Sequence, residues 1–89
     1  MKKRILKPPN GDQVLRAITT IIVELLGVKE QQVSPRNTFL ELGADSVGVV
    51  AVLKEVEIAF EEFQIKFEEG EISPHDKIEK VINSVQEKI

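Results

Sequence analysis

Apolar residues recur at helical spacing in three separate stretches of the chain. Within each stretch the apolar positions lie mostly three or four residues apart, as one face of an α-helix requires. The three sets are Val14, Leu15, Ile18, Ile21, Ile22, Leu25 and Leu26; Val49, Leu53, Val56, Phe60, Phe63 and Phe67; and Ile78, Val81, Ile82, Val85 and Ile89. No stretch alternates for long with a period of two, which argues against strands. The pattern therefore predicts an all-α fold, a small helical bundle with three main helices.

Residues that begin or end helices flank these stretches. Asp12 is expected to cap the first helix, and Gly27 to end it. Asp45 is expected to cap the second helix, which would run about five turns and reach Phe67. The segment Ser73-Pro74-His75-Asp76 has the pattern of a capping box for the last helix, with its proline at the first helical position.

A long loop, residues 28–44, connects the first two helices. Its apolar residues are expected to pack onto the core: Val28, Val33, Phe39, Leu40 and Leu42. Long ordered loops in small domains are often functional, so the place to which this loop leads is informative. It leads to Gly43-Ala44-Asp45-Ser46.

The length and composition limit the possible functions. With 89 residues, the chain is expected to hold one domain, residues 12–89, preceded by a basic and flexible tail, residues 1–11. It contains no cysteine and one histidine, His75, which argues against disulfides and multi-histidine metal sites. Because only one histidine is available for a Ser/His catalytic pair, the composition argues against an enzyme and predicts a non-catalytic protein.

Charge is unevenly distributed along the chain. Residues 1–10 carry four basic side chains and no acid, whereas the remainder carries 8 basic and 15 acidic side chains. An acidic domain disfavours nucleic acid as a partner and favours a basic protein surface. No apolar run approaches the roughly 20 residues of a membrane helix, and the basic start lacks the apolar region of a signal peptide. We therefore expect no membrane association and a cytoplasmic location.

The string Leu42-Gly43-Ala44-Asp45-Ser46-Val47 closes the loop and opens the second helix. Taken alone, an Asp-Ser pair in this position usually means helix capping. A hydroxyl there is also a suitable place for a phosphodiester, because a helix N-terminus offers unpaired N–H groups and the positive end of the helix dipole.

Together with its surroundings, this string resembles the site of the acyl carrier protein family. The resemblance covers essentially residues 12–89 and includes Leu25-Leu26-Gly27-Val28, Val33 and Phe39. In that family the serine of the Asp-Ser pair carries 4′-phosphopantetheine, attached by a dedicated transferase from coenzyme A. The resemblance implies that Ser46 is the modified residue and Asp45 its flanking motif residue.

The resemblance also implies partners and a cargo. The family's arm ends in a thiol that holds acyl groups as thioesters, and the Gly-Ala-Asp-Ser string is more similar to fatty-acid and polyketide carriers than to peptidyl carriers. Partners would be the phosphopantetheinyl transferase, an acyltransferase or synthetase that loads the arm, and processing enzymes such as a ketosynthase. The carrier itself is expected to be a monomer.

The chain departs from the family in its second helix. Val47 stands where the family most often has Leu or Met, and Gly48 and Ala51 stand at positions that are acidic in many fatty-acid carriers. If the helix reaches Phe67 it is about one turn longer than in the family, whereas an end at Phe60 moves the extra residues into the next loop. The family's short third helix would lie within residues 68–76.

One face of the second helix is a candidate docking surface. On a helical wheel Val47, Ala51 and Ile58 lie opposite the predicted core stripe, and we call these three residues the docking ridge. Acidic residues near the ridge would form its rim, and these are Glu57, Glu61 and Glu62. The alternative is that the long loop covers the ridge through Phe39 or Leu40.

Two other functions remain open from the sequence. Asp45-Ser46-Val47-Gly48 is also similar to the site of D-alanyl carriers, so the cargo could be an aminoacyl group, of D-alanyl or peptidyl type. The second alternative is a carrier-like helical interaction module that is never modified.

Overall fold

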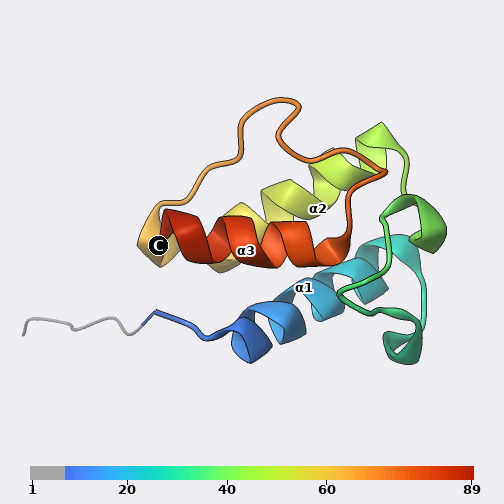
Figure 1. Cartoon of the computed structure of the whole chain (residues 1–89), viewed down its shortest axis with the longest axis horizontal. Coiled ribbons are helices and arrows are strands. Elements are labelled where there is room, and N and C mark those ends of the chain that lie inside the picture. The colour runs from blue at the N-terminus through green and yellow to red at the C-terminus, as the bar shows by residue number, and fades with distance from the viewer. Residues whose placement is uncertain (1–7) are drawn as a thin grey trace, which may run out of the picture.

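The computed structural model describes residues 8–89, and these fold into a bundle of three α-helices (Figure 1). The α-helices are α1 (Gly11–Leu26), α2 (Ser46–Ala59) and α3 (Ile78–Lys88), and the short 3₁₀ helices are η1 (Glu30–Gln32), η2 (Leu40–Leu42) and η3 (Glu61–Phe63). The described residues contain no β-strand, only an isolated bridge between Thr38 and Lys77. The predicted all-α class is confirmed. Of the tail expected over residues 1–11, residues 1–7 lie outside the described residues, and Gly11 already belongs to α1.

The first helix begins two residues earlier than predicted. Asn10, not Asp12, is its N-cap: the Asn10 side chain accepts the Gln13 N–H, and the Gln13 side chain accepts the Asn10 N–H. This reciprocal pair satisfies two amides that Asp12, which lies inside the first turn, cannot reach in the same way. The predicted end is correct, because Gly27 adopts a left-handed conformation with φ of 70°.

The second helix is shorter than the predicted five turns. Asp45 is its N-cap as expected, but α2 ends at Ala59, and Phe60 leaves the helical region with φ of −112°. Phe63 lies in η3 and Phe67 in the following loop, although both still pack against the core. The apolar spacing continues past Ala59 because these phenylalanines cover the same core from outside the helix. The spacing therefore does not show where the helix ends. The alignment that ends the helix at Phe60 is therefore the correct one.

The segment before α3 is a turn and not a helical cap. The Asp76 carboxylate accepts the Ser73 N–H at 2.8 Å, and the Asp76 N–H donates to the Ser73 carbonyl at 3.0 Å, which closes a turn that ends before the helix. Pro74 and His75 lie inside this turn, and Lys77 is the N-cap. The short helix expected within residues 68–76 does not form, and that segment consists of turns, bends and irregular backbone. Gly70, with φ of 79°, supplies one of these turns.

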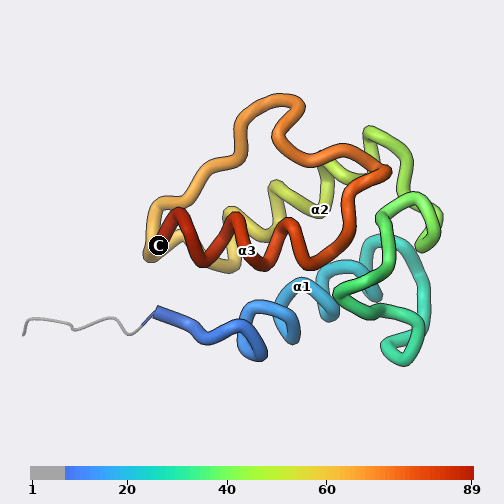
Figure 2. Tube along the Cα trace, viewed as in Figure 1, coloured from blue at the N-terminus to red at the C-terminus, as the bar shows by residue number. Residues whose placement is uncertain are grey.

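The core lies between α1 and the other two helices. In Figures 1 and 2, α1 runs in the opposite direction to both α2 and α3, and it contacts both. The buried apolar residues are Val14, Ile18 and Ile22 of α1; Val49, Val52, Leu53 and Val56 of α2; Ile78, Val81, Ile82 and Val85 of α3; and Phe39, Leu42, Ala44, Phe60, Ile65 and Ile72 of the connecting segments. Leu25, predicted to join them, is 44% exposed in the last turn of α1, directly before Gly27 turns the chain away.

The loop between α1 and α2 is held in place by the segment before α3 and by the first two residues of α3. The backbones pair at four points: Phe39 N–H with the Asp76 carbonyl, Leu40 N–H with Pro74, Ile78 N–H with Asn37, and Glu79 N–H with Pro35, over 2.8 to 3.3 Å. Phe39 and Leu42 are buried as predicted, whereas Leu40, also predicted to pack inward, is 51% exposed. Leu40 and Leu42 point differently because they lie two residues apart in a 3₁₀ turn. This loop is therefore a fixed support for the residues that follow it.

Candidate functional site

Ser46 is the first residue of α2, and the preceding turn fixes its place. Gly43 takes a left-handed conformation with φ of 88°, which a residue with a side chain adopts at a cost. Its N–H donates to the Leu40 carbonyl, and the Ala44 N–H donates to the Phe39 carbonyl, both at 3.0 Å. Because Phe39 and Ala44 are both buried, the turn is anchored on the core while Ser46 is exposed.

Asp45 acts on the helix and not on the serine hydroxyl. One carboxylate oxygen, Oδ1, accepts the Gly48 N–H at 2.9 Å, and the Asp45 carbonyl accepts the Val49 N–H at 2.9 Å. The amides of Ser46 and Val47, in the first turn, have no intrahelical acceptor. They and the helix dipole favour a negative group attached to the Ser46 side chain. The arrangement therefore fits an attached phosphodiester.

The motif is reinforced by a second capping pair that the sequence reasoning missed. The Thr38 N–H donates to the Glu41 carboxylate at 2.8 Å, and the Glu41 N–H donates to the Thr38 hydroxyl at 3.1 Å. The hydrogen bond from the Thr38 backbone is the main cause that lowers the pKa of Glu41. The signal was available, since Thr-x-x-Glu is the sequence pattern of a capping box.

The docking ridge lies on the outer face of α2. Val47 is 77% exposed and Ile58 is 60% exposed, while Ala51 is half-buried. Phe39 points into the core, so it does not cover the ridge. The structure adds one apolar residue that the wheel did not single out: Val50, which is 52% exposed and lies one turn after Ser46.

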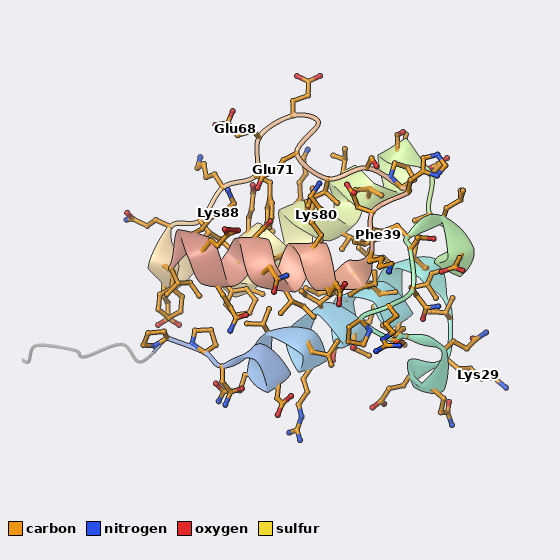
Figure 3. The ribbon with its side chains drawn as sticks, in the orientation of Figure 1. Lys29, Phe39, Glu68, Glu71, Lys80 and Lys88 are labelled. Atoms are coloured by element: carbon orange, nitrogen blue, oxygen red, sulfur yellow. The ribbon has the colours of Figure 1, made fainter. Side chains whose placement is uncertain are left out.

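The predicted acidic rim is only partly directed at solvent. The Glu57 carboxylate accepts the Phe67 N–H at 2.8 Å, which ties α2 to the loop that follows η3. Glu61 and Glu62 lie exposed in η3, beyond the end of α2. The more distant Glu71 pairs with Lys88 of α3 at 3.0 Å, and Figure 3 shows these two side chains coming from the loop and the helix. Glu57 and Glu71 therefore help to hold the loop after η3 in place.

The described part of the chain holds neither a cluster of metal-ligating side chains nor a membrane-spanning helix. No group of three or more His, Cys, Asp or Glu side chains is placed there to hold a metal ion. His75 is exposed in the turn before α3. No described helix is both long enough and apolar enough to cross a lipid bilayer.

Comparison with known proteins places the chain in a family. The family model described as "Phosphopantetheine attachment site" matches residues 16–84. The chain belongs to the phosphopantetheine attachment-site family. A group with this attachment suits the exposed Ser46 and the free amides of the first turn, and the expected covalent cofactor, 4′-phosphopantetheine, is confirmed for the family.

The individual relatives of this phosphopantetheine attachment domain include an acyl carrier protein and a polyketide synthase. The acyl carrier protein of Streptococcus pyogenes serotype M3 is 44% identical over 57 residues, which are 64% of this chain and 76% of that protein. The non-reducing polyketide synthase pkdA of Emericella nidulans is 30% identical over 84 residues, 94% of this chain but only 3% of that protein. No solved structure matches significantly. These similarities confirm an acyl carrier function for the domain.

Proposed function

We propose that Ser46 is the residue to which 4′-phosphopantetheine is attached. The observation that carries this proposal is the placement of one exposed hydroxyl at the N-terminus of α2, on a turn anchored by Phe39 and Ala44. The other serines differ: Ser34 and Ser73 lie in hydrogen-bonded turns, and Ser84 is buried in α3.

The chain's own residues hold the attachment point and leave the chemistry to partners. Asp45 is committed to the Gly48 N–H, so no base is directed at the Ser46 hydroxyl, and a serine without an adjacent base is a weak nucleophile. Catalysis of the attachment then belongs to the phosphopantetheinyl transferase, and we propose that the chain catalyses no step itself. When bound, the group supplies the thiol that carries the cargo as a thioester.

The cargo we propose is an acyl group of a fatty-acid-like or polyketide pathway, delivered by an acyltransferase or synthetase and used by ketosynthase-type enzymes. The relatives support this choice, because one is named an acyl carrier protein and the other a polyketide synthase. We further propose that these enzymes meet the carrier at the docking ridge, with Glu61 and Glu62 near one end. The exposure of Val47 and Ile58 supports that placement.

Incubation with coenzyme A and a broad-specificity phosphopantetheinyl transferase tests the attachment. The intact mass of the wild-type chain should rise by one phosphopantetheinyl group, and Ser46→Ala should not change in mass. Ser34→Ala is the matched control, since it removes a hydroxyl from a loop and should be modified normally. Circular dichroism of Ser46→Ala should remain that of the wild type because the side chain is exposed. Modification of Ser46→Ala would contradict the assignment.

A further inference from the structure

The segment between η3 and α3 is attached to the bundle mainly by its side chains. Figures 1 and 2 show it as a curved loop beside α2 and α3. Between Ile65 and Ile72, the described structure contains one backbone hydrogen bond, from the Glu71 N–H to the Glu68 carbonyl at 3.1 Å, and it lies inside the segment. Ile65 and Ile72 are buried, whereas the residues between them are exposed or half-buried. We call these residues, 66–71, the strap.

Side chains from two helices hold the strap. On α2, the Glu57 carboxylate accepts the Phe67 N–H at 2.8 Å. On α3, the Lys88 ammonium group lies 3.0 Å from the Glu71 carboxylate and 5.5 Å from the centre of the Phe67 ring, so one side chain contacts two residues of the strap. The Lys88 and Glu71 side chains are only 26% and 23% exposed, which reduces the screening of their ion pair by water.

The backbone takes a left-handed conformation near both ends of the strap. Gly70 has φ of 79°, which glycine adopts without penalty. Gln64 has φ of 55°, which costs free energy for a residue with a side chain. Such strain persists only where the surrounding contacts enforce it. Release of the strap would let Gln64 relax, and this lowers the free energy needed to open the strap.

We propose that the strap opens as a unit while α1, α2 and α3 stay folded, and that Lys88 is the latch that keeps it closed. Segments with few buried apolar contacts open at a lower free energy than the helices around them. Opening breaks the two contacts of Lys88 and releases the Glu57 carboxylate, while Ile65 and Ile72 remain buried. The latch therefore controls whether the Glu57 charge is available at the surface of α2. Opening does not depend on modification of Ser46.

Amide hydrogen exchange of the whole chain, in urea concentrations below the unfolding transition, tests whether the strap is a separate unit. The Phe67 N–H should exchange faster than the N–H groups of Ile18 in α1 and Val56 in α2, both of which are buried. Its rate should change little with urea because local opening exposes little surface, whereas the two helix amides should respond steeply. Equal rates with equal urea dependence at all three positions would overturn the separate opening of the strap.

Lys88→Met tests the latch. It should speed exchange of the Phe67 N–H by about 5- to 30-fold, as expected when a partly buried ion pair and a cation–π contact are lost together. Lys88→Arg can keep both contacts and should stay within about twofold. Lys80→Met is the matched control, because it removes the same group from α3 but its partner, Asp76, lies outside the strap. The Phe67 rate in this control should also stay within about twofold.

Circular dichroism shows whether each variant is folded. If Lys88→Met is not, Glu71→Gln removes the charge on the strap side of the same ion pair and should speed exchange of the Phe67 N–H by at least about threefold. An unchanged Phe67 rate in the folded variant would show that Lys88 is not the latch. Equal acceleration by Lys80→Met would assign the effect to the charge of α3 as a whole, and would overturn the latch as well.

Discussion

At the scale of single residues, side chains that could serve a partner are already engaged in the fold. Asp45 flanks the proposed attachment residue, yet its carboxylate caps α2 through the Gly48 N–H. Glu57 was expected on the rim of the docking ridge, yet it accepts the Phe67 N–H across ten residues of sequence. In both cases the polar group satisfies a backbone amide that the helix or loop leaves without an acceptor.

The hydrogen bond of Glu57 leads to a prediction for stability. Glu57→Ala leaves the half-buried Phe67 amide without its acceptor and should lower the free energy of unfolding by about 1 to 3 kcal/mol. Glu55→Ala, two residues away and exposed, should change it by less than about 0.5 kcal/mol. Urea unfolding followed by circular dichroism measures both. Equal effects of the two substitutions would mean that the Glu57 bond contributes nothing to the fold.

At the scale of elements, the end of α2 is where local pattern and tertiary structure differ. Phe60 is the last buried residue of the helical stripe, 8% exposed, and it forms the C-cap. Phe60→Ala should therefore cost about 3 to 5 kcal/mol, a large part of the stability of a small domain. Ile58→Ala removes an aliphatic side chain of the same helix that is 60% exposed, and should cost far less. Thermal unfolding compares them, and a small shift for Phe60→Ala would show that the core is placed wrongly.

The sequence predicted the helices better than their ends. Apolar spacing located all three helices, and the left-handed glycine at Gly27 and the cap at Asp45 followed from local chemistry. Asn10 was missed because Asp12 is an equally good cap by composition, and only the Gln13 partner decides between them. The turn at residues 73–76 has the composition of a cap but pairs with the loop at Phe39 and Leu40, a contact between distant segments that no local pattern records.

The residues of the candidate site were likewise predictable only where they depend on local sequence. Ser46 and the exposed Val47 and Ile58 were predicted from the motif and the helical wheel, because both depend on neighbours within a few residues. The use of Glu57 by the Phe67 amide could not be predicted, since it depends on how the chain folds back after η3.

At the scale of the whole molecule, carboxylates that hold connecting segments make stability depend on pH. A hydrogen bond from the Ser73 N–H lowers the pKa of Asp76 below its ordinary 3.8, and a hydrogen bond from the Glu68 N–H lowers the pKa of Glu71 below its ordinary 4.5. Groups with a depressed pKa stabilise the fold when ionised, and this contribution is lost as the pH falls through the folded-state pKa.

The midpoint of thermal unfolding should therefore be constant from neutral pH down to about pH 5 and fall below about pH 4.5. The double variant Asp76→Asn, Glu71→Gln should be less stable at neutral pH and show a smaller fall in acid. Calorimetry over this pH range makes the comparison. A variant that loses as much stability in acid as the wild type would assign the acid sensitivity to other groups.

The central claim is that Ser46 carries the phosphopantetheinyl group, and fragmentation mass spectrometry of the loaded chain tests it most directly. The wild-type chain is loaded from coenzyme A, digested, and the peptide that contains residues 42–50 is fragmented. One group per chain is expected, located on Ser46, with the peptides that contain Ser34, Ser73 and Ser84 unmodified. A group on any other serine, or a fully folded chain that a transferase active on a control carrier leaves unmodified, would contradict it.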